Sequence, residues 1–239
     1  MKKVYKWILL CLLLFVCAAI VIAYLLFTKT AEVVIDKTKY PVTGIDVSNH
    51  TGKIDFNQIK EQGVDFVYVK ATEGSNFTDQ SFERNYSNAK LAGIPVGAYH
   101  FFRFNKSGKD QAKHFLKHIK GKQLELPLVL DVEDWGNPSG MKRETVTAEL
   151  QHFIEDVEKE VKEDVMIYTN ESGYRSYISG NFDNKSIWIC SFSNSPKINT
   201  KWTLWQHSHI GELNGAEGRI DLNTFNGSRV EWNTYLLSR

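Results

Sequence analysis

The sequence has little of several features that would otherwise decide its class. It contains three cysteines, and two of them, Cys11 and Cys17, lie in an apolar N-terminal run, so a disulfide framework cannot hold the fold together. Only 5 prolines and 16 glycines occur in 239 residues, which excludes a collagen-like or low-complexity chain. The formal net charge of +1 lacks the basic excess of nucleic-acid-binding proteins. The fold must therefore rest on its apolar core, and we expect no nucleic-acid partner.

Motifs for metals and phosphates are also missing. The sequence has no glycine-rich phosphate-binding loop, and His114 and His118, which are four residues apart, lack the glutamate of an HExxH zinc motif. We therefore assign the two histidines to a solvated helix face. The sequence predicts neither a metal nor a cofactor.

One long run lacks charge altogether. Residues 7–27 (WILLCLLLFVCAAIVIAYLLF) carry no charged side chain and follow a basic tail, residues 1–6, that holds three lysines. About 20 apolar residues span a bilayer as a helix, whereas the apolar region of a signal peptide has about 7–15. The run predicts an uncleaved transmembrane signal anchor, with a cleaved signal and a lipoprotein signal as alternatives. The flanking lysines predict a single-pass protein of the cell membrane, with a cytoplasmic N-terminus and the remainder of the chain extracellular.

The remainder of the chain alternates between two periodicities. We interpret residues 28–42 as a tether and residues 43–239 as one domain. Short apolar, β-branched runs, which are typical of buried strands, recur at 44–50, 66–74, 94–102, 126–134, 165–170, 187–192, 202–208 and 219–225. Amphipathic stretches at helical spacing separate the first five runs. This α/β pattern predicts a mainly parallel sheet in a small barrel whose last third lacks helices, and an open doubly wound sheet is the competing fold.

Polar side chains gather where the predicted strands end. They include acids, an amide and aromatic residues: Asp46, Glu73, Tyr99, Asp131, Glu133, Tyr168, Trp205, Gln206 and Asp221. In a parallel barrel the C-terminal strand ends share one face, where such enzymes carry their active sites. A face that collects acids and aromatic rings is typical of a saccharide cleft.

Two of these acids lie two residues apart on one predicted strand. Asp131 and Glu133 therefore point to the same side, with Cα atoms about 6.5–7 Å apart. Close carboxylates repel each other's charge, so that one acts as an acid while the other stays ionised, which glycosidic bond cleavage requires. The alternative is that both only cap a loop or pair with lysines. Asp46 and Asp221, each between isoleucine and another apolar residue, favour the functional interpretation, because barrel closure makes their strands neighbours.

Six segments then make the pattern specific. They are GIDVSNHTGKIDF, FVYVKATEG, GIPVGAYHFF, PLVLDVED, WTLWQHS and GRIDLNTFNG, in this order. Over roughly residues 42–232 the chain resembles glycoside hydrolase family 25, the Chalaropsis-type lysozymes or N-acetylmuramidases. The resemblance implies an irregular TIM-like (β/α)5(β)3 barrel. It implies Glu133 as the general acid/base and Asp131 as the group that polarises the substrate's 2-acetamido group.

The same resemblance implies further site residues. Asp46 and Asp221 become the remaining acids of the cleft, and Tyr99 and Trp205 match its aromatic residues. We add Glu73, Tyr168 and Gln206 as substrate contacts.

The resemblance also implies a reaction. It is hydrolysis of the β-1,4 bond between N-acetylmuramic acid and N-acetylglucosamine in peptidoglycan, with retention of configuration. We expect catalysis assisted by the substrate, because a carboxylate two residues along the same strand is badly placed to reach the opposite face of the sugar. A catalytically silent wall-binding barrel and a chitinase-like hydrolase are the alternatives. The expected partners are peptidoglycan glycan strands and, through the N-terminal helix, a membrane; we expect a monomer.

Overall fold

The computed structural model describes residue 6 and residues 12–20, 33–192 and 195–238. The chain divides into two units, residues 1–32 and residues 33–239. Every strand described below belongs to the second unit, and so do helices α2 to α7.

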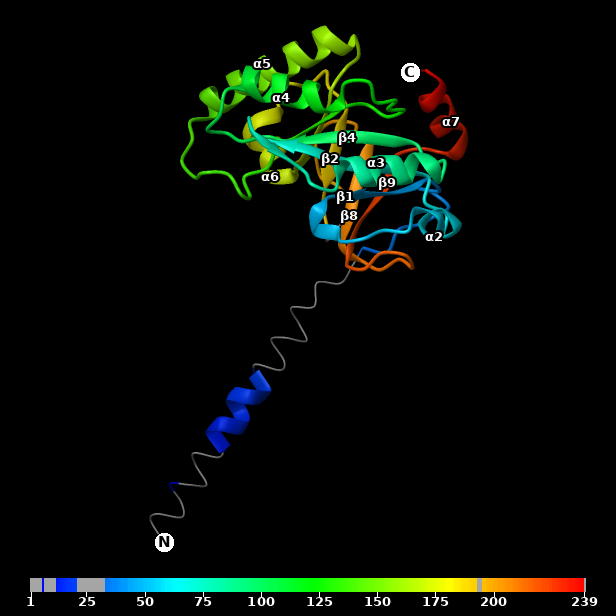
Figure 1. Ribbon diagram of the computed structural model, residues 1–239. Helices are drawn as coiled ribbons and strands as arrows, with labels where there is room; N and C mark the ends of the chain where they lie inside the picture. The colour runs from blue at the N-terminus through cyan, green and yellow to red at the C-terminus, as the bar shows by residue number, and fades with distance from the viewer. Residues whose placement is uncertain (1–5, 7–11, 21–32, 193–194, 239) are drawn as a thin grey trace. The chain divides into compact units, whose positions relative to one another are not determined.

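Eight strands of the second unit close into a barrel (Figure 1). They are β1 (Thr43–Val47), β2 (Phe66–Glu73), β4 (Val96–Phe101), β5 (Val129–Asp131), β6 (Met166–Asn170), β7 (Ile187–Cys190), β8 (Leu204–Gly211) and β9 (Ile220–Phe225). Neighbouring strands from β1 to β8 pair in parallel, whereas β9 is antiparallel to both β8 and β1. The short β3 (Phe77–Thr78) forms a hairpin with β2.

Helices cover the outer face of the barrel. They are α2 (Phe56–Glu61), α3 (Phe82–Leu91), α4 (Gly108–Ile119), α5 (Arg143–Val161), α6 (Glu171–Gly173) and α7 (Arg229–Leu237), with the single turns η1 (Asn49–Thr51) and η2 (Tyr174–Ile178). Side-chain caps begin several of them: the Asp55 carboxylate accepts two backbone N–H bonds at α2, and the Ser107 hydroxyl accepts one at α4. Helices α4 and α5 lie side by side (Figure 1). Outward-facing strand residues such as Ile45 and Val69 form the core beneath the helices.

Large rings fill the interior of the barrel. Phe66 and Tyr68 of β2 are both fully buried there. Glycines on the two neighbouring strands make room for these rings, because a Cβ on Gly44 would lie 2.3 Å from the ring of Phe66 and one on Gly97 would lie 2.2 Å from that of Tyr68. The barrel is therefore a filled core, and polar side chains reach the solvent only at its rim.

The predicted TIM-like barrel behind a transmembrane helix is wrong in two respects. A TIM barrel has eight parallel strands, whereas β9 makes this sheet mixed. The reason lies in the connection from β8 to β9, which spans only residues 212–219. A parallel crossover needs about a dozen residues or more, and a shorter connection leaves only the antiparallel return.

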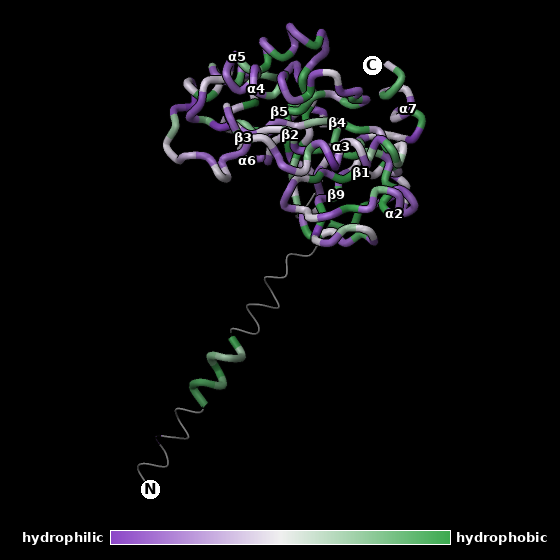
Figure 2. The backbone as a smooth tube through the Cα atoms, viewed as in Figure 1, coloured by the Kyte–Doolittle hydropathy of each residue, from purple (hydrophilic) through white to green (hydrophobic). Residues whose placement is uncertain are grey.

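The second correction concerns the membrane helix. Within the described ranges, no helix is long and apolar enough to cross a membrane. Of the predicted span, residues 12–20 are helical and strongly apolar (Figure 2), and residues 7–11 and 21–27 lie outside the described residues. Nine helical residues extend about 14 Å, about half of a bilayer core. Of the predicted tether, residues 28–32 also lie outside the described residues, while Tyr40 and Val42 are buried in the barrel unit.

Candidate active site

The four predicted acids meet at one end of the barrel. Asp131 is the last residue of β5, and Glu133 follows it by two residues. Asp46 of β1 lies directly opposite Asp221 of β9 in the antiparallel ladder. Because β9 runs against its neighbours, its beginning lies where the other strands end, which brings Asp221 to the same rim.

A chain of hydrogen bonds fixes Asp46. The Tyr168 hydroxyl donates to Gln206 Oε1 at 2.8 Å, and Gln206 Nε2 donates to Asp46 Oδ2 at 2.9 Å. From the other side, the Trp188 indole N–H donates to Asn223 Oδ1 at 2.9 Å, and Asn223 Nδ2 donates to Asp46 Oδ2 at 2.8 Å. An indole N–H can only donate, so Asn223 must turn its amino group toward Asp46. We call these five residues the amide network.

The amide network decides which of two paired acids holds a proton. Burial raises the pKa of Asp221 to about 9, and the charge of the neighbouring Asp46 adds to this effect. Burial also raises the pKa of Asp46, but the hydrogen bonds from Asn223 and Gln206 oppose the rise. A hydrogen bond joins the two carboxyl groups. At neutral pH Asp221 is therefore protonated and donates the hydrogen bond that Asp46 accepts.

The pKa values of Asp131 and Glu133 are both raised. Burial raises the pKa of Glu133 to about 7, and the charge of Asp46 contributes to the rise, so Glu133 is poised to give and take a proton near neutral pH. Burial also raises the pKa of Asp131, as does the charge of Glu133, while the charge of Lys70 opposes both. Oδ1 of Asp131 is buried and has no hydrogen-bond partner among the described residues. This oxygen is an acceptor available to a ligand.

Glu73 is held in an ion-pair cluster beside these acids. It lies at the end of β2 and accepts hydrogen bonds from Lys70 Nζ at 2.6 Å and from Arg103 Nε at 2.9 Å. Burial works against its charge, but Lys70 and Arg103 together keep the pKa of Glu73 below its usual range. Lys70 also lies over the ring of Phe101, 5.0 Å from its centre. Both oxygens of Glu73 are thus engaged, and its clearest role is to hold Lys70 near Asp131.

Four of the predicted residues at the rim reach the solvent. Glu73, Glu133, Asp221 and Tyr99 are half-buried, whereas Asp46, Asp131, Tyr168 and Gln206 lie deeper. Burial raises the pKa of Tyr99 far above its usual value, so its hydroxyl stays protonated and can donate a hydrogen bond. A ligand at the rim therefore meets Glu133 and Tyr99 first, with Asp131 behind them.

The structure does not bring Trp205 into the site. Its side chain is 1% exposed, its indole N–H donates to the Ser191 carbonyl at 2.8 Å, and its ring packs against Tyr40. Successive side chains of a strand point to opposite faces, so Trp205 faces the outer core because Gln206 faces the barrel interior. Trp205 therefore supports the strand that carries Gln206.

The predicted set of site residues omits several residues that the structure places in the site. Asn223 lies two residues after Asp221, and strand alternation alone places both on one face. Lys70 follows Phe66 and Tyr68 at the same two-residue spacing. Trp188 lies in an apolar run with no local signal of a polar contact. Across the described ranges, no group of three histidine, cysteine or acidic side chains is arranged to hold a metal ion.

Comparison with known proteins identifies the family. The sequence profile described as "Glycosyl hydrolases family 25" matches residues 45–216, a segment that contains Asp46, Asp131 and Glu133. The chain belongs to glycosyl hydrolase family 25. The matched segment ends before Asp221, so the place of that residue in this family 25 site rests on the barrel geometry.

Relatives and solved structures agree with this assignment. Lysozyme M1 of Streptomyces globisporus is 39% identical over 203 residues, which make up 78% of this chain and 68% of that protein. An N,O-diacetylmuramidase of Chalaropsis sp. is 30% identical over 203 residues, covering 75% of this chain and 96% of the relative. The structure of a family 25 glycosyl hydrolase from Bacillus anthracis matches with a TM-score of 0.80 and 38% identity, over 87% of this chain and 98% of that one. Membership of family 25 confirms the predictions of a glycosidase and a peptidoglycan hydrolase.

Proposed function

We propose that this family 25 enzyme cleaves the β-1,4 bond between N-acetylmuramic acid and N-acetylglucosamine with retention of configuration. The observation that carries the proposal is the pair of acids at the end of β5. Glu133 has a pKa of about 7, which suits a general acid, and Oδ1 of Asp131 is buried with no hydrogen-bond partner among the described residues. The names of the relatives, a lysozyme and an N,O-diacetylmuramidase, support the same substrate. All the site residues come from one chain, which supports a monomeric enzyme. We place it outside the cell as part of the proposal, because peptidoglycan lies there.

In the first step, protonated Glu133 gives its proton to the glycosidic oxygen as the bond from that oxygen to the anomeric carbon breaks. The carbonyl oxygen of the substrate's own acetamido group attacks the anomeric carbon and forms an oxazolinium ion. Asp131 accepts the acetamido N–H on its free oxygen and stabilises the positive charge that develops there. Protonation of Glu133 favours this role, because it removes the charge that opposes ionisation of Asp131.

In the second step, Glu133 acts as a base. It takes a proton from water, whose oxygen attacks the anomeric carbon and opens the oxazolinium ring. The acetamido group is restored, Glu133 is protonated again, and two inversions give net retention. This route is an accepted exception to the scheme in which a protein carboxylate is the nucleophile.

The test measures lysis of a wall suspension by the full-length chain. Glu133→Gln keeps the size of the side chain but cannot transfer a proton, so we expect a loss of about 10²–10⁴-fold with the fold intact by thermal unfolding. Asp131→Asn should lower kcat sharply, since it removes the charge that stabilises the intermediate. Lysis near the wild-type rate by a folded Glu133→Gln variant would reassign the acid.

The stereochemistry decides between mechanisms. NMR of the first-formed product should show the β anomer, and a thiazoline analogue of the oxazolinium should inhibit more strongly than the parent sugar. An α product would eliminate the retaining route. A covalent adduct of a fluorinated sugar on Asp131, Asp46 or Asp221 would replace substrate assistance with a protein nucleophile. Cleavage of chitin oligosaccharides faster than wall glycan would favour a chitinase-like specificity instead.

A further inference from the structure

One helix carries a row of unpaired lysines. Lys109, Lys113 and Lys117 follow one another at intervals of four residues along α4, and Lys120 lies directly after its end. We call these four residues the lysine row. All four are exposed, and none forms an ion pair with another described residue. Like charges four residues apart repel each other, so the stability of α4 does not explain the whole row.

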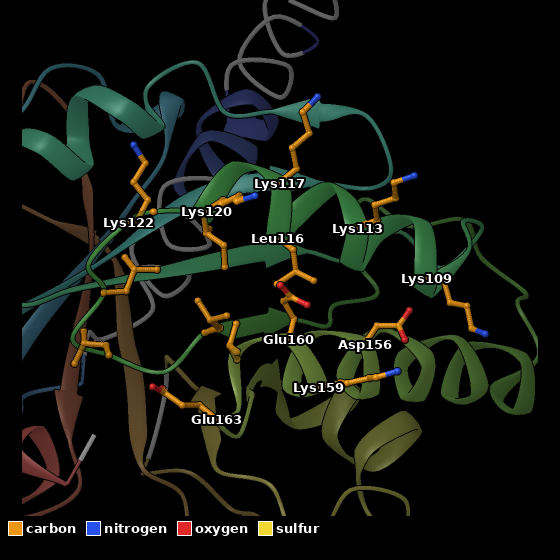
Figure 3. Close-up of a pocket in the computed structure, with 16 residues that line it drawn as sticks. Lys109, Lys113, Leu116, Lys117, Lys120, Lys122, Asp156, Lys159, Glu160 and Glu163 are labelled. Atoms are coloured by element: carbon orange, nitrogen blue, oxygen red, sulfur yellow. The ribbon is translucent and has the colours of Figure 1, made fainter.

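The row borders a groove between α4 and α5 (Figure 3). The groove has a volume of about 800 Å³ and lies away from the carboxylates of the active site. Its floor is apolar and includes Leu116, and its α5 side carries Asp156 and Glu160. In Figure 3 the amino groups of Lys113 and Lys117 point away from α5. The α5 side thus carries charges of both signs, because Lys159 lies between Asp156 and Glu160, whereas the α4 side carries the lysine row.

The row differs in charge from the rest of the chain. Without the four lysines of residues 1–30, the chain has 25 basic and 28 acidic residues. A mildly acidic domain has no general attraction for anions, so a local row of four positive charges selects a ligand that can lie along it.

We propose that the lysine row binds a linear phosphodiester polymer that has no bases, such as poly(glycerol phosphate). Four residues of helix rise about 6 Å, so the row presents one ammonium group about every 6 Å over about 16 Å. An extended polyanion can place successive phosphates against these groups and release its counterions.

Two other polyanions fit the surface less well. A flat anionic bilayer laid on α4 would also meet the acids of α5, because the two helices lie side by side. Single-stranded nucleic acid is held by exposed aromatic rings on which its bases stack. Within α4, Phe115 is fully buried, and the rings of His114 and His118 contact each other with their centres 4.5 Å apart. Beside α4, Phe77 of β3 is 40% exposed and offers one ring, not a series of rings along the lysine row. A narrow polymer without bases matches both observations.

The test is direct binding of poly(glycerol phosphate) to the full-length chain by calorimetry at several salt concentrations. With four lysine contacts, the logarithm of the association constant should fall with the logarithm of salt concentration at a slope of about −3. In the variant Lys113→Gln/Lys117→Gln/Lys120→Gln the slope should weaken by about 2 and the affinity at low salt should fall at least about 10-fold.

The matched control is Lys37→Gln/Lys53→Gln/Lys201→Gln, which removes three exposed lysines outside α4 and changes the net charge equally. It should bind as the wild type does. An equal loss in the control, no salt-dependent binding, or tighter binding of oligo(dT) or of phosphatidylglycerol vesicles would each overturn the proposal. Because binding is measured without hydrolysis, its outcome is independent of the mechanism proposed above.

Discussion

At the scale of single residues, the surroundings of Glu133 set its pKa and with it the proposed role as an acid. Burial raises its pKa to about 7, whereas the Tyr168 hydroxyl, 3.5 Å from Oε1, acts in the opposite direction. The one hydrogen of this hydroxyl is shared between Glu133 and Gln206 Oε1, 2.8 Å away, so Tyr168 also belongs to the amide network that fixes Asp46. Tyr168 therefore links the acid that transfers the proton to Asp46.

This link predicts the behaviour of Tyr168→Phe. Without the hydroxyl, the pKa of Glu133 should rise further. Since Glu133 must be protonated to act as an acid, the alkaline limb of the kcat/KM profile should then move to higher pH. Loss of one hydrogen bond should also lower kcat/KM at the optimum about 2- to 10-fold. The measurement is the pH profile of wall lysis by the wild type and the variant.

Tyr177→Phe is the matched control for this substitution. The Tyr177 hydroxyl donates to Asp134 Oδ1 at 2.9 Å and is not part of the amide network. Removal of the Tyr177 hydroxyl should leave the alkaline limb of the kcat/KM profile at the wild-type pH. A limb that stays fixed or moves down in Tyr168→Phe would show that the tyrosine does not act on Glu133.

At the scale of elements, strand periodicity was the most informative part of the sequence. Each of the eight predicted runs overlaps a strand of the barrel, and the predicted contact between the strands of Asp46 and Asp221 is confirmed by their register. The direction of β9 was not predictable from periodicity, because the length of the connection before it decides that direction. The contact from Trp188 to Asn223 joins residues 35 positions apart, so it depends on register rather than on local pattern.

Trp205 shows where a family resemblance and strand geometry disagree. The resemblance placed Trp205 in the cleft, and we added its neighbour Gln206 as a substrate contact. Adjacent residues of a strand face opposite sides, so only one of them can enter the barrel. The polar member, Gln206, does so, because Asp46 and Tyr168 supply partners for its amide.

Closure of the barrel depends on small residues beside large rings. Gly97 lies next to Tyr68, and an added Cβ would lie 2.2 Å from its ring. We expect Gly97→Ala to destabilise the fold by about 1–3 kcal/mol, as overpacking of a filled core does. Chemical denaturation measures the change.

Gly218→Ala serves as the control for this prediction. The nearest atom to a Cβ at Gly218 is the Thr51 carbonyl oxygen at 3.4 Å, an ordinary contact. Its free energy of unfolding should change by no more than about 0.5 kcal/mol. Equal free energies of unfolding for Gly97→Ala and Gly218→Ala would mean that the Tyr68 ring moves aside without destabilising the fold.

For the whole molecule, the collected acids make stability depend on pH. Glu133 and Asp221 have pKa values of about 7 and about 9 in the folded chain, above the values of about 4 of free carboxyl groups. At pH values between the unfolded and the folded pKa of each group, the folded state keeps a proton that the unfolded state has released. Stability rises with pH only where the unfolded state binds more protons, so these two acids make it fall as the pH rises from about 5 to 9.

Glu133→Gln should therefore stabilise the protein, and most strongly at alkaline pH. We expect its free energy of unfolding to exceed that of the wild type by about 1–3 kcal/mol at pH 9, with the difference shrinking toward pH 5. Glu73→Gln is the opposite case, because the pKa of Glu73 is held below its usual range. Its carboxylate stabilises the fold above pH 5, so this variant should lose stability equally at pH 7 and pH 9. Chemical denaturation at pH 5, 7 and 9 tests both predictions. If the free energies of unfolding of Glu133→Gln and the wild type differed by the same amount at all three pH values, Glu133 would be ionised in the folded state without an energetic penalty.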